Sequence, residues 1–429
     1  MKKAALHNLG CKVNASETEA MQEILENAGY EIVPFAEIAD IYIINTCTVT
    51  NIADRKSRQM LHRARKQNPD AIIVAAGCYA QAQENEKHPI EPCVDIVIGN
   101  NRKKDLLQIL KQYELQRQKT KEVIDINHTK EYETLHLTKT GEHTRAYIKV
   151  QDGCNQFCSY CIIPLARGRV RSRTAEDVVK EVTALAENGY KEVVLTGIHL
   201  SSYGLDLEQG NSLLSLILAV HKIEGIQRIR LGSLEPRIIT EEFARTIAAL
   251  PKICPHFHLS LQSGCDATLK RMNRRYTSEE YYEKCVLLRK YFDHPALTTD
   301  VIVGFPGETE EEFAASKAFV NKVDFYETHI FKYSRREGTK AAVMDGQVPE
   351  PVKTRRSNEM LEMGIEKQRK YEESFLGKEV EVLIEEPAML DGRQVQSGHT
   401  REYLKVVLEG NENRQNELVK LRLTKEMLR

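Results

Sequence analysis

Three closely spaced cysteines are the residues of this sequence best suited to chemistry. Cys154, Cys158 and Cys161 follow the spacing C-x3-C-x2-C in the segment GCNQFCSYC. Cysteine thiolates bind soft metals and hold iron–sulfur clusters. Three thiolates bind three irons of a 4Fe-4S cube and leave the fourth iron without a protein ligand, whereas a structural zinc site takes four protein ligands. The spacing therefore predicts an iron–sulfur cluster with one open iron, and the alternative is three unrelated buried cysteines.

A second set of three cysteines is brought together by topology rather than by local spacing. Cys11, Cys47 and Cys78 follow the first, second and third predicted strands of the chain. The carboxyl ends of neighbouring parallel strands line one edge of a sheet, so we expect the three thiols to converge there. On the residues alone, coincidence is an equal alternative, because cysteine is commonly buried. Four other cysteines lack metal-like spacing and are interpreted as packing residues: Cys93, Cys254, Cys265 and Cys285.

The elements that must position these cysteines begin with a predicted parallel α/β domain over residues 1–112. Short apolar runs at 3–9, 40–45, 71–77 and 94–100 alternate with helical patterns. A helix is expected from Ser16, as its N-cap, to Gly29. Continuous apolar strands separated by helices indicate a parallel sheet that is covered on both faces. Residues 113–143 are polar and are predicted to form a linker with at most one short strand.

The remainder of the chain predicts two further domains, which makes this a three-domain α/β protein. Residues 144–370 contain about six βα units, and repeated units of this kind favour a partial (β/α)6 barrel. The predicted strands lie at 145–150, 192–197, 227–232, 256–261, 298–305 and 326–331. Residues 371–429 alternate apolar and polar side chains with period two, which predicts a small antiparallel β-barrel.

The composition limits the class of protein. The chain has 429 residues, of which 41% are hydrophobic and 29% charged, as is typical of a globular protein with several domains. Lys and Arg number 61 against 62 Asp and Glu, so nucleic-acid binding would have to use local patches. We expect a cytoplasmic protein without membrane contact, because no signal-peptide pattern and no apolar run of about 18 residues is found. In that reducing compartment, grouped cysteines indicate metal binding or catalysis.

The motifs around both cysteine sets resemble those of the radical S-adenosylmethionine (SAM) methylthiotransferases. The resemblance spans the chain and is carried by NLGCKVN, INTCTVTNIADRKSRQ, AAGCYAQ, KVQDGCNQFCSYCIIPLARGRVRSR, LTGIH, LQSG and DVIVGFPGETEEEF. It implies a three-cysteine N-terminal domain, a radical SAM partial barrel and a C-terminal TRAM β-barrel. It also implies two 4Fe-4S clusters, a radical SAM cluster on the closely spaced cysteines and an auxiliary cluster on Cys11, Cys47 and Cys78.

The resemblance is strongest to the bacterial branch that modifies threonylcarbamoyladenosine in tRNA. It implies insertion of a methylthio group at adenine C2 next to the anticodon, with two SAM molecules used per turnover. The implied partners are tRNA, an electron donor such as flavodoxin or ferredoxin, and a sulfur donor, and we expect a monomer. The alternatives are a member that acts on an isopentenylated tRNA adenosine or a ribosomal-protein side chain, and a non-catalytic iron–sulfur RNA-binding protein.

Candidates for SAM binding lie at the carboxyl ends of the predicted barrel strands, where barrel active sites are found. They are Thr196, Gly197, Ser233, Glu235, Gln262 and Asp300, together with Tyr160, whose ring is placed to flank a bound nucleoside. For each strand-end residue the alternative is a role in a turn. Glu235 is favoured, because a carboxylate stabilises the sulfonium and amine of SAM electrostatically.

Candidates for RNA contact are arginines clustered after barrel strands, because arginine suits bidentate phosphate binding. They are Arg167, Arg169, Arg171, Arg173, Arg274, Arg275, Arg335 and Arg336. The alternative is a solvated surface without a partner. The C-terminal domain has nine Lys and Arg against twelve Asp and Glu from residue 371 onward, so its RNA role rests on the resemblance to TRAM domains.

Overall fold

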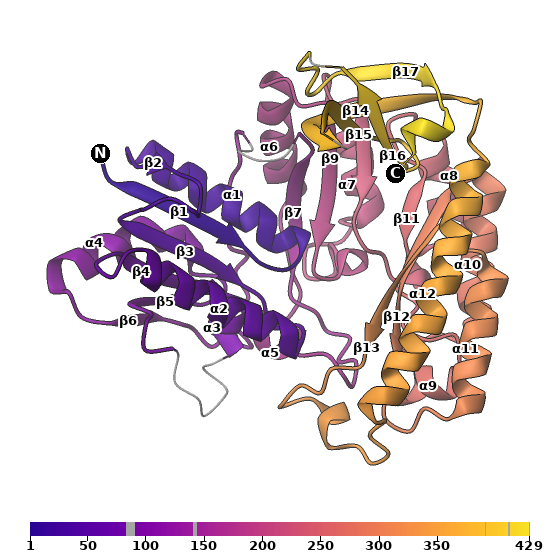
Figure 1. Cartoon of the computed structure of the whole chain (residues 1–429), viewed down its shortest axis with the longest axis horizontal. Helices are drawn as coiled ribbons and strands as arrows, with labels where there is room; N and C mark the ends of the chain where they lie inside the picture. The colour runs from indigo at the N-terminus through magenta and orange to yellow at the C-terminus, as the bar shows by residue number, and fades with distance from the viewer. Residues whose placement is uncertain (83–90, 140–143, 391, 411, 429) are drawn as a thin grey trace.

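The computed structural model describes residues 1–82, 91–139, 144–390, 392–410 and 412–428, which form three parts in chain order (Figure 1). A parallel α/β domain at the N-terminus lies beside a central barrel, and a small antiparallel sheet covers one end of that barrel. This arrangement confirms the predicted α/β class. Within the described residues, no helix combines the length and the hydrophobicity needed to cross a bilayer.

The N-terminal domain is built on one parallel sheet with the strand order β2-β1-β3-β4-β5-β6. Ile43 belongs to the same apolar cluster as Met21 and Leu106 on one face, whereas its neighbour Ile44 packs with Leu61 on the other. Alternate residues thus reach opposite faces, which is why the strands are apolar throughout. The strands are β1 (Lys3–Asn8), β2 (Glu31–Ile32), β3 (Ile41–Thr46), β4 (Ile72–Gly77), β5 (Ile96–Ile98) and β6 (Thr120–Glu122), and the helices are α1 (Lys12–Asn27), α2 (Asn51–Gln67), α3 (Cys78–Ala82) and α4 (Leu106–Gln116).

Two predictions for this domain were wrong in detail. The first helix begins at Lys12 with Cys11 as its N-cap, and Ser16 is buried within it. The expected end near Gly29 is confirmed, since α1 stops at Asn27. The predicted boundary at residue 112 falls inside α4. The one short strand allowed in the linker is β6, and it pairs with β5 as the sixth strand of the sheet. An edge strand has only one neighbour, so β6 can be polar and still belong to the sheet.

The central domain confirms the six predicted barrel strands. Strands β7, β9 and β10 pair in parallel, as do β11, β12 and β13, and single bridges join β10 and its following loop to the β11 region. Within the described residues β7 and β13 do not pair, so the barrel remains open between them. The strands are β7 (Ala146–Asp152), β8 (Arg171–Ser172, antiparallel to β7), β9 (Glu192–Gly197), β10 (Arg228–Leu231), β11 (His256–His258), β12 (Ala296–Val303) and β13 (Glu327–Lys332).

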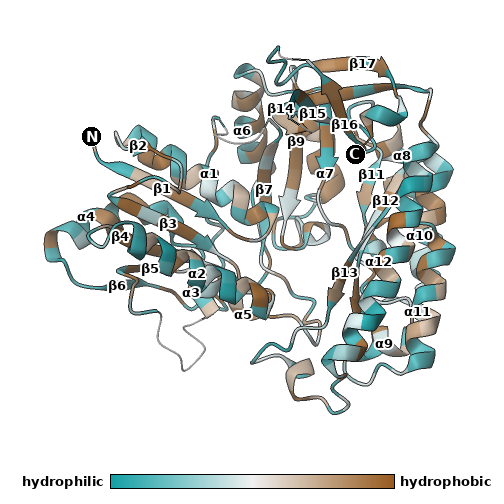
Figure 2. Ribbon diagram, in the orientation of Figure 1, coloured by the Kyte–Doolittle hydropathy of each residue, from teal (hydrophilic) through white to brown (hydrophobic). Residues whose placement is uncertain are grey.

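Helices cover the outside of the barrel and turn their polar faces to solvent (Figure 2). In α6 the buried residues include Val178, Val182 and Leu185, as the sequence pattern predicts. The helices are α5 (Ile163–Arg167), α6 (Ala175–Glu187), α7 (Leu213–His221), α8 (Glu241–Ala248), α9 (Asp266–Arg271), α10 (Ser278–Tyr291), α11 (Glu310–Val323) and α12 (Glu350–Glu373). Short 3-10 turns are η1 (Lys103–Asp105), η2 (Leu200–Ser202), η3 (Pro236–Ile238), η4 (Lys340–Val343) and η5 (Lys425–Met427).

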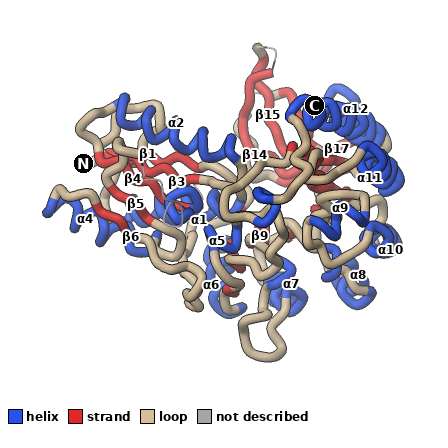
Figure 3. The backbone as a smooth tube through the Cα atoms, turned by 90° about the horizontal axis from the view of Figure 1, so that it is seen from below, coloured by secondary structure: helices blue, strands red, loops and turns tan. Residues whose placement is uncertain are grey.

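The C-terminal domain is an antiparallel sheet with the order β16-β15-β14-β17. Its strands β14, β15 and β17 are labelled in Figure 3. Its strands are β14 (Glu379–Leu390), β15 (Arg393–Thr400), β16 (Lys405–Glu409) and β17 (Leu418–Arg422). A bridge from Val406 to Leu428 brings the segment after β17 back to β16. Strand β15 has the mostly polar sequence RQVQSGHT, which gives a weak strand signal of its own.

Buried arginines fasten this sheet to the strands of the barrel. Arg228 donates to the backbone oxygen of Glu381 at 2.6 Å, and Arg230 donates to that of Arg401 at 3.0 Å. Both guanidinium groups are buried against the carboxylate of Glu192. Because buried charges must be paired, these contacts fix the C-terminal sheet against β10 and leave the carboxyl ends of the strands open.

Candidate active site

A cavity of about 300 Å³ lies at the carboxyl ends of the barrel strands. All three closely spaced cysteines, Cys154, Cys158 and Cys161, line it. Val49 and Thr50, which follow β3 of the N-terminal domain, complete its wall. A pocket of this size at strand ends is where enzymes with barrel folds bind small ligands.

The loop that carries these cysteines depends on a glycine. Gly153 has a φ of +70°, and a Cβ atom there would lie 1.8 Å from the backbone oxygen of Arg169. Only glycine permits this approach without strain. The loop is then closed by two backbone hydrogen bonds, from Cys154 to Gly168 and from Cys161 to Cys158, each 3.0 Å long. These contacts direct the three thiols to one cavity.

Positive charge and amide groups approach the sulfur atoms in this cavity. Arg274 donates from Nη1 to the Sγ of Cys158 at 3.3 Å, and the backbone N–H of Gln156 donates to the Sγ of Cys154 at 3.5 Å. Burial raises the pKa of Cys154 to about 11 and that of Cys161 to about 12. The thiols thus stay protonated at neutral pH until metal binding displaces the protons, and the nearby cation then stabilises the thiolates.

Most of the predicted SAM contacts come together in this cavity. Its wall includes Tyr160, Ser233, Glu235, Gln262 and Asp300. Thr196 and Gly197 do not line it. Thr196 is buried, and a Cβ atom on Gly197 would lie 2.8 Å from the side-chain oxygen of Gln151, so this strand end faces protein and not the cavity.

Sequence reasoning missed His199, which lines the cavity two residues after β9. Its Nδ1 lies 2.6 Å from the hydroxyl oxygen of Ser202, and its Nε2 has no hydrogen-bond partner within the described part of the chain. Burial, with Arg274 and Arg237 nearby, lowers the pKa of His199 to about 4. The ring is neutral at pH 7 and offers one unused polar nitrogen. His199 belongs to the motif LTGIH, but the sequence did not predict that its side chain would point into the cavity.

The second cysteine set lies at the carboxyl ends of β1, β3 and β4, as the topology predicts. Cys11 is the N-cap of α1, Cys47 directly follows β3, and Cys78 begins α3. Gly10 has a φ of +108°, and a Cβ atom there would lie 3.0 Å from the Sγ of Cys47. Burial and the neighbouring Cys78 and Cys11 thiols raise the pKa of Cys47 to about 12. The three thiols are therefore close enough to interact electrostatically.

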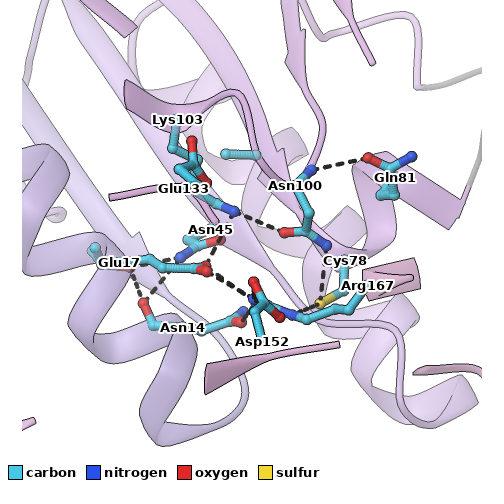
Figure 4. Close-up of polar contacts among 12 residues, drawn as sticks. Asn14, Glu17, Asn45, Cys78, Gln81, Asn100, Lys103, Glu133, Asp152 and Arg167 are labelled. Carbon is cyan, nitrogen blue, oxygen red and sulfur yellow. Dashed lines mark hydrogen bonds and ion pairs between the residues drawn. The ribbon is translucent and has the colours of Figure 1, made fainter. Parts of the chain in front are cut away.

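Polar side chains tie together the loops that carry this second set (Figure 4). The amide of Asn14 donates to the backbone oxygens of Leu9 at 2.7 Å and Thr46 at 3.0 Å, which joins the ends of β1 and β3. The Sγ of Cys78 accepts from Nε of Arg167 at 3.2 Å. It also lies 3.7 Å from the side-chain nitrogen of Asn100. The second cysteine set is therefore supported by groups that donate to sulfur.

The sulfurs of neither cysteine set are gathered around one point. Among the described residues, neither set has its three Sγ atoms within 4.8 Å of one another. Thiolates bound to one tetrahedral zinc at about 2.3 Å would lie roughly 3.8 Å apart, so neither set has the arrangement of a single zinc site.

Most of the predicted RNA-contacting arginines are not on the surface. Arg167, Arg171, Arg173 and Arg336 have 0%, 1%, 2% and 4% of their surface exposed, so their prediction as RNA contacts was wrong. Arg274 lies in the cavity wall beside Cys158. A buried guanidinium must be paired, and each of the four forms ion pairs with carboxylates.

Three of the predicted arginines are exposed near the cavity. Arg275 and Arg335 directly follow the cavity residues Arg274 and Ser334, and Arg169 lies against the cysteine loop with its guanidinium 4.5 Å from the Phe157 ring. The buried Arg336 serves another purpose. It donates to Asp54 and Thr48, at 2.5 and 2.8 Å, in the loop region after Cys47. This contact fixes the second cysteine set to the barrel domain.

Comparisons with known proteins agree with this division of the chain. A model of the radical SAM superfamily matches residues 148–320, and the model described as uncharacterized protein family UPF0004 matches residues 3–99. The solved structure of the radical SAM methyltransferase TsrM from Kitasatospora setae has a TM-score of 0.56 at 17% identity, and covers 80% of this chain and 74% of that one. This likeness concerns the fold.

Curated relatives match nearly the whole chain. Threonylcarbamoyladenosine tRNA methylthiotransferase MtaB of Bacillus subtilis is 42% identical over 426 residues, which cover 99% of this chain and 94% of that protein. The tRNA-2-methylthio-N(6)-dimethylallyladenosine synthase of Moorella thermoacetica is 36% identical over 97% of this chain and 94% of its own length. With such identity along its full length, the chain belongs to the radical SAM methylthiotransferase family.

Proposed function

We propose that the protein transfers a methylthio group to C2 of N6-L-threonylcarbamoyladenosine, next to the anticodon of tRNA. The observation that carries this proposal is the pair of three-cysteine sets on two domains that share one cavity wall. The substrate is proposed from similarity, because relatives named for threonylcarbamoyladenosine are 37–42% identical and those named for dimethylallyladenosine are 34–37% identical.

Each cysteine set would bind one of the two proposed iron–sulfur clusters. Cys154, Cys158 and Cys161 would hold the radical SAM cluster, and the second set would hold the auxiliary cluster. When bound, these clusters supply reductive cleavage of one SAM and the sulfur that a second SAM methylates before transfer. The reaction needs an electron donor such as flavodoxin or ferredoxin and a sulfur donor. The protein's own residues provide orientation and a site shielded from water.

The cavity offers the groups that SAM binding requires. Glu235 is 7% exposed. Its backbone N–H donates to the hydroxyl oxygen of Ser201 at 2.8 Å, and Nε of Arg237 donates to its carboxylate at 2.8 Å, so its position is fixed. A buried carboxylate beside the cysteine loop stabilises the amine and sulfonium of SAM. Ser233 and Gln262 supply neutral hydrogen-bonding groups for the ribose and carboxylate. Tyr160 contributes an aromatic wall.

Exposed arginines near the cavity provide a test of RNA binding. Replacing Arg169, Arg275 and Arg335 together with glutamine should weaken tRNA binding and flatten its dependence on salt, because each lost phosphate contact lowers the slope of log K against log salt by about 0.7–0.9. Filter binding at several salt concentrations measures both effects. A control with glutamine at Arg369, which is exposed on α12 outside the cavity wall, should bind normally. An unchanged slope in the triple variant would favour a protein substrate.

The substrate itself is tested by mass analysis of tRNA nucleosides from cells that lack the gene. We expect the 2-methylthio form of threonylcarbamoyladenosine to disappear and the unmodified precursor to accumulate, with both restored by the wild-type gene. Loss of methylthio groups from isopentenylated adenosine instead would support the alternative tRNA substrate. Unchanged tRNA together with an altered ribosomal protein would contradict the proposal.

A further inference from the structure

Arg167 connects the two domains through a fully buried side chain. It ends α5, six residues after Cys161, and reaches into the N-terminal domain (Figure 4). Its Nη1 donates to the carboxylate of Glu17 at 2.7 Å, and its Nη2 donates to Oδ1 of Asn14 at 2.6 Å. Its Nε donates to the Sγ of Cys78 at 3.2 Å. One side chain of the barrel domain therefore contacts a cysteine of the second set.

The buried groups around Arg167 carry surplus positive charge. Within the described residues, four cations form their ion pairs with the carboxylates of Glu17 and Asp152, at 2.7–3.6 Å: Lys103, Lys149, Arg167 and Arg171. Even with the buried Glu133 counted as a third carboxylate, one positive charge is left over. An uncompensated buried charge is strongly unfavourable, so the arrangement requires an anion nearby.

The sulfur of Cys78 lies beside these cations and, as a thiolate ligand of a bound cluster, would balance their charge. It contacts Arg167 directly and Asn100 at 3.7 Å, and the side-chain oxygen of Asn100 accepts from Nζ of Lys103 at 2.7 Å. Two buried cations thus act on one sulfur, one directly and one through an amide. Of the other buried free cysteines, Cys47 belongs to the same second set, and Cys254 and Cys285 lie in the barrel domain.

We propose that Arg167 is a positioning residue for the auxiliary cluster, which orients the Cys78 thiolate and raises the reduction potential of a cluster bound to the second cysteine set. This inference rests on the proposed function, because it requires a cluster at that site. Reduction adds a negative charge to a cluster, and hydrogen bonds and positive charge at a ligand sulfur stabilise the reduced form. Since Arg167 comes from the barrel, the auxiliary site is complete only when both domains pack together.

The test uses the full-length chain with Cys154, Cys158 and Cys161 replaced by alanine, which leaves only the second set to bind a cluster. In this parent, Arg167→Gln should retain iron but lower the ratio of reduced to oxidised cluster about tenfold at a fixed potential, a negative shift of about 59 mV for one electron. Arg167→Lys, which keeps the positive charge, should shift the reduction potential less. Arg173→Gln removes an equally buried arginine that pairs with Asp177 and Glu181, and should cause no shift.

Electron paramagnetic resonance during a redox titration measures the ratio, and iron analysis measures occupancy. Selective loss of iron from Arg167→Gln also supports the positioning role, since Arg173→Gln controls for general damage. If the Arg167→Gln variant does not fold, the double variant Arg167→Gln with Glu17→Gln takes its place in the comparison. The double variant removes one positive and one negative charge together, so the net charge of the buried cluster stays unchanged. An unchanged potential and iron content in the glutamine variant overturn the inference. Absence of iron from the parent contradicts the auxiliary cluster itself, and so the proposed function.

Discussion

Replacing Cys158 with alanine should lower the rate of reductive SAM cleavage by about 100-fold or more. Cys158 is one of three thiols that line the cavity, and its Sγ accepts a hydrogen bond from Arg274. On the proposed assignment the variant would lack a cluster ligand, and it leaves the guanidinium of Arg274 without its sulfur partner. Release of 5′-deoxyadenosine from dithionite-reduced protein, measured by mass spectrometry, gives the rate.

The matched control for this variant is Cys285→Ala. Cys285 is a fully buried free cysteine on α10, and its replacement removes a thiol without touching the cavity. We expect the control to cleave SAM at the wild-type rate once its fold is verified by circular dichroism. Retained cleavage in Cys158→Ala would mean that the closely spaced cysteines do not hold the radical-forming cluster.

Replacing Cys47 with alanine should stop methylthio transfer while SAM cleavage continues. The thiol follows β3 in the N-terminal domain, whereas the three cysteines that line the cavity belong to the barrel domain. Anaerobically reconstituted wild-type protein should bind about eight irons, and the variant about four. Iron analysis, 5′-deoxyadenosine release and methylthiolated tRNA nucleosides are measured on the same preparation.

Cys93→Ala is the control for this second experiment. Cys93 is a partly buried cysteine of the same domain that packs on the apolar cluster behind the sheet. It should leave iron content and transfer unchanged. Transfer at the wild-type rate in Cys47→Ala would remove the auxiliary role from the second cysteine set, and four irons or fewer in the wild type would contradict the two-cluster model.

The spacing of residues along the chain predicted much of the fold. The six barrel strands and the strand ends that carry Cys11, Cys47 and Cys78 followed from apolar periodicity and parallel topology. The polar edge strand β6 and the polar strand β15 were harder to predict, because their hydrogen bonds come from neighbouring strands and their own composition resembles that of loops. The start of α1 at Lys12 depends on the turn at Gly10, which a cap motif at Ser16 obscured.

The arginines show what only the tertiary structure decided. The sequence by itself identified the first cysteine set, because its spacing is a local property of the chain, and it predicted the second set from the order of the strands and the family resemblance. It placed Arg167 and Arg169 in the same basic cluster, yet the first is fully buried against Cys78 and the second is exposed beside the cysteine loop. The reason is physical. Whether a guanidinium meets water, a carboxylate or a sulfur depends on which distant elements pack over it, and these elements are set by the whole fold.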